Sequence, residues 1–246
     1  MKKLVAYLTS GYPDTQFTID LALSLKEVGV DSLELGIPFS DPVADGNVIE
    51  KANLLALKHG VKFNHIKTIT KAISTQIDTL WMGYYNSFYK QGFDKLTKEA
   101  KELNVSGFII PDLPYEEALI HSDIMNKHNI NNISFIAPTD SLDRIKNILK
   151  DSKKFIYLVA YTGITGSGKE ENLDPIIEDI RSVTNTPIYV GFGVNQNTAK
   201  EKVKNVDGVI VGSDFVKELL NDSLSHTKKI QIITEKARVI KEIINL

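Results

Sequence analysis

The stretch GVDSLELGIPF, residues 29–39, combines a helix end, a short strand and the turn that follows it. Gly29 suits the left-handed position that ends many helices, and the alternation in SLELG predicts a strand. The stretches NVSGFIIPDLP (104–114) and NVDGVIVGSDF (205–215) have the same order of Gly or Asn, valine, a small polar pair, strand and turn. This weak internal repeat predicts a fold assembled from repeated helix–strand units.

Apolar runs alternate with amphipathic stretches along the whole chain of 246 residues. The runs that predict strands are KLVAYLTS, SLELGI, LWMGYY, GFIIPDL, ISFIAP, FIYLVA, PIYVGFG and GVIVGSD. Helical patterns such as TQFTIDLALSLKEVG (15–29) and DKLTKEAKELNV (94–105) lie between them. Eight strands, each followed by a helix, predict an α/β fold, a single-domain (β/α)8 TIM barrel over residues 1–246. An open doubly wound sheet is the alternative.

Composition and charge exclude several classes of protein. The formal net charge of -2, with no Lys/Arg block, argues against a nucleic-acid surface. The chain has no cysteines and its five histidines lack short paired spacing, so we expect no disulfide and no metal site. Gly11 and Pro13 break the first apolar run too early for a signal peptide, and no apolar stretch reaches membrane-spanning length. We therefore expect a cytoplasmic protein.

The ends of the predicted strands carry the polar residues that suggest a site, because barrels place function at the carboxyl ends of their strands. Carboxylates follow the earlier strands, and glycines with a serine follow the later ones. These residues include Glu34, Asp112, Gly193, Gly212 and Ser213. The set predicts a site for an anionic substrate that needs acid–base chemistry.

Glu34 is the strongest catalytic candidate. In SLELG, Leu33 and Leu35 point to one side and Glu34 to the other, so Glu34 faces the barrel interior. Burial there would raise its pKa and suit it to proton transfer near neutral pH. The alternative is a structural acid bonded to backbone or tyrosine hydroxyl groups. Asp41 and Asp45, in the loop that follows, fit turn or helix-cap positions equally well when taken alone.

The stretch GITGSGKE (163–170) is one residue short of a Walker A motif. Glu170 stands where that motif has a Ser or Thr for Mg²⁺, and the better helix start comes later, at Asp174 as N-cap and Pro175 as first helical residue. We therefore interpret these glycines as part of a long loop before that helix rather than as an ATP site.

Six stretches resemble the tryptophan synthase alpha subunit family. They are LELGIPFSDPVADG, MGYYNSFYKQG, GFIIPDLPYEE, YLVAYTGITG, GFGV and VGSDFV, and they are collinear with the family over nearly the whole chain. The resemblance implies a (β/α)8 barrel that cleaves indole-3-glycerol phosphate to indole and glyceraldehyde 3-phosphate. It implies a retro-aldol lyase reaction in tryptophan biosynthesis that needs no cofactor on this chain.

The resemblance also assigns the site residue by residue. Glu34 and Asp45 match the two catalytic acids, which can protonate indole C3 and accept the indole N–H. The positions that match substrate-binding residues of the family are Tyr157, Thr165, Gly166, Gly193, Gly212 and Ser213. Thr165 matches the lid threonine that bonds the aspartate on closure, which makes the stretch GITGSGKE part of a lid loop. The glycines with Ser213 match the phosphate cradle, beside a short helix that begins at SDFVKEL.

The resemblance further implies a beta-subunit partner, in an α2β2 complex with pyridoxal phosphate on beta only. The positions expected at that interface are Asp41, Pro38, Asn86 and Asp112. The loops after strands 2, 3 and 4 also carry four aromatic residues that we expect to be exposed as anchors, Phe39, Phe88, Tyr89 and Tyr115. The alternative is that these rings fold back onto the rim.

The chain departs from the family pattern in three features. Tyr161 stands where many members have arginine, and Asn47 replaces a common proline. The chain also begins almost at the first strand, so either something else covers the end of the barrel at which the strands begin, its floor, or this floor is less well packed. Two other functions remain open from the residues alone. They are a sugar-phosphate isomerase of histidine or tryptophan synthesis and a barrel that only regulates a partner. A lyase assay distinguishes these two functions from the lyase activity that the resemblance implies.

Overall fold

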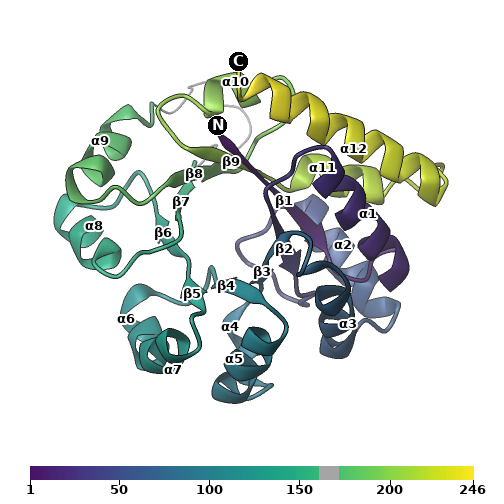
Figure 1. Cartoon of the computed structure of the whole chain (residues 1–246), viewed down its shortest axis with the longest axis horizontal. Helices are drawn as coiled ribbons and strands as arrows, with labels where there is room; N and C mark the ends of the chain where they lie inside the picture. Colours follow the sequence, from purple (N-terminus) through teal and green to yellow (C-terminus); the bar gives the residue numbers. More distant parts are fainter. Residues whose placement is uncertain (161–171) are drawn as a thin grey trace.

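The computed structural model describes residues 1–160 and 172–246, and in this part of the chain nine parallel strands form one sheet. They are β1 (Lys3–Thr9), β2 (Ser32–Gly36), β3 (Asp78–Met82), β4 (Val105–Ile109), β5 (Asn131–Asn132), β6 (Ser134–Ile136), β7 (Ile156–Val159), β8 (Ile188–Gly191) and β9 (Gly208–Val211). Their order in the sheet is β5-β4-β3-β2-β1-β9-β8-β7-β6. Figure 1 shows the strands around the centre of the molecule and the helices outside them.

The sheet closes into a barrel through residues 131–136. β5 pairs with β4 and β6 pairs with β7, and the one residue between β5 and β6 is Ile133. The Ile133 amide donates to the Phe108 carbonyl over 3.0 Å, so β5 and β6 together serve as one barrel strand. The predicted (β/α)8 barrel is therefore confirmed, and the open doubly wound sheet is excluded.

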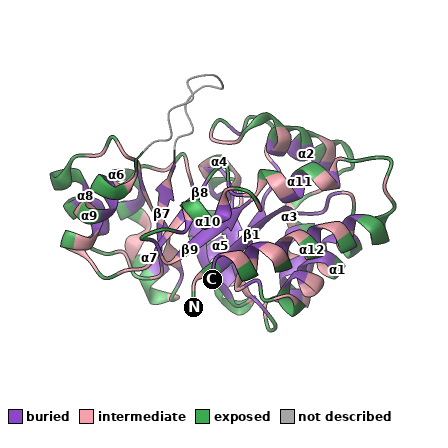
Figure 2. Cartoon of the chain, turned by 90° about the horizontal axis from the view of Figure 1, so that it is seen from above, coloured by how far each residue is buried: buried purple, intermediate pink, exposed green. Residues whose placement is uncertain are grey.

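Helices surround this barrel and expose their outer faces, which are green in Figure 2, while the strands between them are buried. The helices of the described residues are α1 (Thr15–Glu27), α2 (Asn47–Lys58), α3 (Phe63–Ile73), α4 (Tyr85–Tyr89), α5 (Phe93–Glu102), α6 (Tyr115–Ala118), α7 (Ser122–Lys127), α8 (Leu142–Leu149), α9 (Asp174–Val183), α10 (Ala199–Lys202), α11 (Ser213–Leu219) and α12 (His226–Ile243), with a 3₁₀ turn η1 (Leu119–His121).

The start of α9 differs from the prediction by one residue. Leu173 is the N-cap, and Asp174 is already helical, followed by Pro175 in the first turn. The Asn172 side chain accepts the Asp174 amide over 3.0 Å, while the Asp174 carboxylate accepts from Asn205 over 2.9 Å. The capping oxygen thus comes from Asn172, which leaves Asp174 free to contact the segment before β9.

The three repeated stretches have the backbone that their sequence predicts. Gly29, Asn104 and Asn205 have φ angles of 91°, 55° and 58°. A left-handed residue lets the chain turn sharply from the helix into the next strand, and Gly and Asn adopt it with little strain. The three repeated stretches therefore share the turn that leads into β2, β4 and β9.

The alternation in β2 separates the two layers of the core. Leu33 and Leu35 are fully buried against the helices, and Glu34 lies on the opposite side of the strand. On β3, Trp81 is fully buried, stacks on Phe108 and donates to Thr70 of α3 over 2.9 Å. The single tryptophan is thus a core residue.

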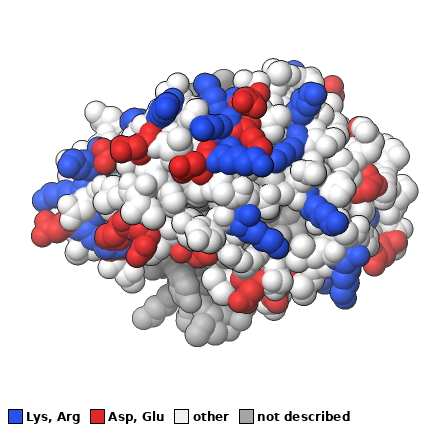
Figure 3. All heavy atoms as spheres, turned by 90° about the horizontal axis from the view of Figure 1, so that it is seen from below, with Lys and Arg blue, Asp and Glu red and all other residues white. Residues whose placement is uncertain are grey.

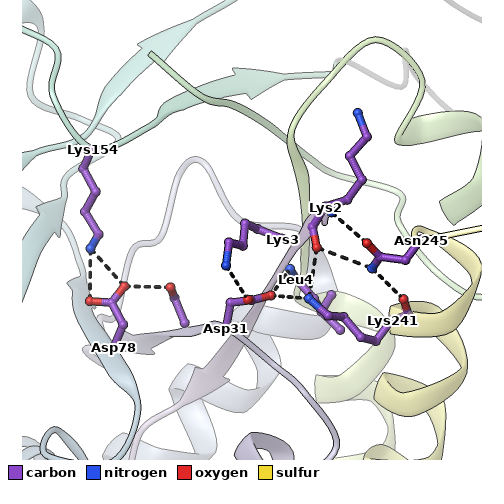
Figure 4. Close-up of polar contacts among 9 residues, drawn as sticks. Lys2, Lys3, Leu4, Asp31, Asp78, Lys154, Lys241 and Asn245 are labelled. Carbon is purple, nitrogen blue, oxygen red and sulfur yellow. Dashed lines mark hydrogen bonds and ion pairs between the residues drawn. The ribbon is translucent and has the colours of Figure 1, made fainter. Parts of the chain in front are cut away.

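Ion pairs cover the end of the barrel at which the strands begin. Figure 4 shows Asp31 between Lys3 and Lys241, and Asp78 bonded to Lys154. Asp31 also accepts the Leu4 amide over 2.8 Å, so this cluster joins β1, β2 and α12. These side chains cover part of the barrel floor, and a hollow of about 550 Å³ remains beside them, lined by residues 1–3, 187, 189, 207 and 244–246. On the face drawn in Figure 3, acidic and basic side chains are likewise interleaved.

Candidate active site

Glu34 lies on the interior side of β2, opposite Tyr7 of β1 and Leu80 of β3 in the sheet register. Its side chain is buried, with 2% exposed, and its Oε1 atom has no hydrogen-bond partner among the described residues. Burial raises its pKa to about 8, and the nearby charge of Asp45 adds to this shift. Glu34 is therefore largely protonated at neutral pH and can donate a proton.

Asp45 lies in the loop between β2 and α2. Its amide donates to the Pro42 carbonyl over 2.9 Å, which closes a turn and directs the side chain inward. Burial raises the pKa of Asp45 to about 6, and a hydrogen bond from the Tyr84 hydroxyl opposes this shift. The residue as a whole is half-buried, but its Oδ2 atom is fully buried. Asp45 is mainly ionised at neutral pH.

Both acids line one cavity of about 400 Å³ at the carboxyl ends of the strands. Apolar side chains form much of its wall, namely Val48, Ile49, Met82, Ile109, Phe135 and Ile210. Such a wall suits a flat aromatic ring and lowers the local polarity, which explains why both carboxyl groups have raised pKa values. The structure thus brings together the two acids that the sequence analysis selected.

Tyr157 of β7 lines the same cavity and stacks on Phe135, with ring centroids 4.9 Å apart. Burial, followed by the charges of Glu34 and Asp45, holds its pKa well above the usual value. Gly191 makes room for this ring, because a Cβ atom there would lie 2.4 Å from the Tyr157 hydroxyl oxygen. Tyr157 is therefore a neutral hydrogen-bonding group beside the acids.

Gly193, Gly212 and Ser213 lie together in another part of the cavity wall. Gly193 has a φ of 70°, and the Thr198 hydroxyl donates to its carbonyl over 2.7 Å, which fixes the loop after β8. Gly212 is the N-cap of α11 and Ser213 is its first residue. Backbone N–H groups at such a helix start favour an anion.

Several predictions fall on the segment outside the described residues. Thr165 and Gly166, the glycine-rich stretch 163–170 and Tyr161 all lie in 161–171. Their roles as lid residues stay predictions. The strand predicted before this segment, FIYLVA, is confirmed as β7.

Of the positions predicted for a partner, Asp41, Asn86 and Asp112 are exposed, whereas Pro38 is buried. The Asp112 carboxylate accepts the Tyr85 amide over 2.8 Å and so links the loop after β4 to the start of α4. Pro38 can therefore shape this rim, but it offers little surface of its own.

The prediction of four exposed aromatic anchors is wrong for Phe88, which is fully buried against Phe93 and Phe108. Phe39 is half-buried and stacks on Tyr84. Tyr115 is also half-buried, and Tyr89 is 67% exposed. Most of these rings fold back onto the rim, because an apolar ring gains more from the adjoining core than from water.

Sequence reasoning missed two groups that line the cavity, Tyr7 of β1 and Lys217 of α11. The alternation in KLVAYLTS places Tyr7 two residues before Thr9 on one face of the strand, and this signal could have placed it inside the barrel. Lys217 is exposed, four residues after Ser213 on the short helix, and its charge favours an anion in this part of the cavity.

No group of three or more His, Cys, Asp or Glu residues in 1–160 and 172–246 could hold a metal ion. The fold and the cavity define a barrel enzyme in which one buried and one half-buried carboxyl group, of different pKa, line a cavity with an apolar wall and with backbone N–H groups that favour an anion. Such a site can protonate a carbon atom with one acid and stabilise a cation with the other.

The family profile of the tryptophan synthase alpha chain matches residues 1–245. The tryptophan synthase alpha chain of Wolinella succinogenes is 57% identical over 246 residues, which are all of this chain and 96% of that protein. The solved alpha subunit from Campylobacter jejuni is 36% identical, with a TM-score of 0.86 over 96% of this chain and 95% of that one. A structure of Mycobacterium tuberculosis tryptophan synthase is 28% identical, with a TM-score of 0.89 over 100% and 93% of the two chains.

The chain therefore belongs to the tryptophan synthase alpha chain family. The family consists of carbon–carbon lyases whose role is the cleavage of indole-3-glycerol phosphate in tryptophan biosynthesis. Within the described residues, no helix is long and apolar enough to cross a membrane.

Proposed function

We propose that Glu34 and Asp45 divide the acid–base work of the retro-aldol cleavage of indole-3-glycerol phosphate. Glu34 protonates indole C3, which makes this carbon tetrahedral and places a positive charge on the ring. Asp45 accepts the indole N–H and stabilises that charge. The glycerol hydroxyl then returns a proton to Glu34, its oxygen becomes the aldehyde of glyceraldehyde 3-phosphate, and the electrons of the broken carbon–carbon bond restore indole.

The observation that carries this proposal is the pair of unlike acids in one cavity. The pKa of Glu34 is raised to about 8 and that of Asp45 to about 6. Between these values one acid holds a proton and the other is ionised, which is the state that the reaction needs.

The remaining part of the cavity suits the rest of the substrate. We assign the phosphate group to the backbone N–H groups of Gly193, Gly212 and Ser213 and to the Ser213 hydroxyl, with Gly166 completing the cradle, and we assign the lid residue Thr165 to a bond with Asp45 on closure. Tyr157 contributes a neutral hydroxyl near the reacting atoms. What supports this assignment is that the described members of the set all line the cavity that contains Glu34 and Asp45.

The dependence of kcat/KM on pH tests the division of work. Asp45 must be ionised and Glu34 protonated, so we expect a bell-shaped profile with its acid limb near 6 and its alkaline limb near 8. The limbs report the coupled pair rather than either residue alone. The measurement is indole release from indole-3-glycerol phosphate between pH 5 and 9. A rate that rises steadily across this whole range would contradict the assignment.

We further propose that this chain works with a tryptophan synthase beta subunit, in an α2β2 complex with pyridoxal phosphate on beta only. The support is family membership and the likeness to solved structures of tryptophan synthase. Asp41, Asn86 and Asp112 supply exposed polar groups at the rim, and Tyr89 supplies an exposed ring. The site itself recruits no cofactor in this proposal, because both acids work without one.

Mixing the chain with a purified beta-subunit dimer tests the partner. We expect co-elution at micromolar concentration and an increase of about tenfold or more in kcat, because docking orders the loop that carries Asp45. Tyr89→Ala should weaken co-elution, whereas Ile120→Ala, which removes another exposed side chain, serves as the matched surface control. Full activity of the chain alone, with no co-elution, would make a free-standing lyase the better interpretation.

We also propose that residues 1–246 form one domain and that the enzyme is cytoplasmic. The family profile spans residues 1–245, which supports a single unit. The phosphorylated substrate of the family is charged and does not cross a lipid bilayer, so the reaction takes place where that substrate is made.

A further inference from the structure

Helix α11 begins in the cavity wall and is held along its length by α12, which lies beside it in Figure 1. The Lys236 ammonium of α12 donates to the Asp214 carboxylate over 2.9 Å and to the Glu218 carboxylate over 2.8 Å. The ammonium of Lys229, a residue that is 4% exposed, donates to the Leu219 carbonyl over 2.7 Å, at the last residue of α11. Helix α12 therefore fixes α11 at both of its ends.

The two sides of α11 carry opposite charges. Residues four apart lie on the same side of a helix. Ser213 and Lys217 share a side, and both line the cavity. Asp214 and Glu218 share the side that contacts Lys236 of α12. Asp214 is also part of the cavity wall, since it follows Ser213 in the first turn, so a carboxylate lies where the proposed function places a phosphate.

A carboxylate beside a phosphate opposes binding, because like charges repel each other, and the repulsion is stronger next to apolar walls than in water. The Lys236 charge offsets that of Asp214, and the bond between them holds the carboxylate on the α12 side of the helix. The two side chains are 20% and 21% exposed, so solvent and salt screen this pair less than a fully exposed one.

Lys236 keeps its charge at neutral pH. Burial lowers its pKa, but the hydrogen bonds to Glu218 and Asp214 outweigh burial and raise it. Lys236 is not among the described residues that line the cavity, so it can act on a ligand only through its neighbours on α11.

We propose that Lys236 is a positioning residue for phosphate binding, which neutralises Asp214 and keeps its carboxylate out of the space that the phosphate occupies. This inference rests on the proposed function, which places the phosphate of the substrate at Gly212 and Ser213. Removal of the Lys236 charge should therefore weaken phosphate binding, whereas removal of the Asp214 charge should strengthen it.

The test is the affinity of the purified chain for glycerol 3-phosphate, measured by isothermal titration calorimetry at neutral pH. We expect Lys236→Gln to raise Kd about tenfold and Asp214→Asn to lower it about threefold. The double variant should return to within about twofold of wild type, because both members of the pair have lost their charge. Lys241→Gln is the matched control and should leave Kd unchanged, since it removes an α12 lysine that pairs with Asp31 on the barrel floor.

Steady-state kinetics give the second readout. Lys236→Gln should raise KM for indole-3-glycerol phosphate about tenfold and change kcat by less than about twofold, because phosphate binding is the same in the ground state and the transition state. Lys236→Arg keeps the charge and should keep the affinity within about threefold of wild type. A double variant with Asp214→Asn that binds as weakly as Lys236→Gln would show damage to α11 and overturn the positioning role.

Ser213→Ala locates the bound phosphate, because its hydroxyl belongs to the proposed site. If Ser213→Ala weakens binding and Lys236→Gln does not, the role of Lys236 is overturned while the proposed function stands. If Ser213→Ala has no effect, the phosphate binds elsewhere, and the proposed phosphate site fails together with the role of Lys236. If Lys236→Gln does not fold, Asp214→Asn decides alone, and an unchanged Kd in that variant overturns the inference.

Discussion

Glu34→Gln is expected to lower kcat for indole-3-glycerol phosphate cleavage by about three orders of magnitude or more, with a change in KM below about threefold. The substitution keeps the shape of the side chain and its place on β2, but an amide cannot donate the proton that indole C3 must receive. Steady-state indole release measures the effect. The alkaline limb of the pH profile, near 8 in wild type, should disappear with the carboxyl group.

The control for this variant is Glu50→Gln, which removes an exposed carboxylate from the first turn of α2. It should leave kcat and KM unchanged. Near-normal turnover in Glu34→Gln would remove Glu34 from the mechanism, and an equal loss in Glu50→Gln would show that net charge, rather than proton transfer, is responsible.

The Glu34→Gln variant should also show how far the buried acid lowers the free energy of unfolding. The pKa of Glu34 is about 8 in the folded chain and 4.5 in its ordinary state, so the folded chain holds a proton that the unfolded chain has lost. The free energy of unfolding of wild type therefore falls as the pH rises from about 4.5 to 8. The Glu34→Gln variant has no such titration, so near pH 8 we expect its free energy of unfolding to exceed that of wild type.

The fold could be predicted because its rules are local. The turn into β2, β4 and β9 needs a left-handed residue, and this position is indicated in the sequence by Gly29, Asn104 and Asn205. The alternation around Glu34 likewise fixes which side of β2 faces the interior. What local rules could not show is how the sheet closes, because the break at Ile133 depends on pairing with β4 and β7.

Residues of the candidate site could be selected from the sequence, but the electrostatics of the cavity could not be predicted. Glu34 stands out on its strand and Asp45 was selected through the family resemblance, yet their unequal pKa values depend on side chains from other elements. The contact of Tyr84 with the loop that carries Asp45 follows only from the packing of two loops, because its hydroxyl oxygen accepts the Ala44 amide. Phe88 was predicted to be exposed, because its burial depends on contact with Phe108 of β4, which is distant in sequence and meets it only in the folded chain.

Asp45→Asn is expected to lower kcat/KM by about two to three orders of magnitude. The asparagine keeps the size of the side chain and can still accept a hydrogen bond from the Tyr84 hydroxyl and from the indole N–H. It has no negative charge, however, and the charge is what stabilises the cation formed when C3 is protonated. In an apolar cavity, a fixed charge next to a developing one counts for far more than in water.

The pH profile distinguishes this loss from the loss of Glu34. Asp45→Asn should abolish the acid limb near 6, while the alkaline limb remains and moves downward, because the charge of Asp45 no longer raises the pKa of Glu34. Glu34→Gln should do the reverse and leave an acid limb alone. Each of the two substitutions is thus expected to remove a different limb of the bell-shaped pH profile. An Asp45→Asn enzyme that keeps its acid limb would show that another group supplies the negative charge beside the indole ring.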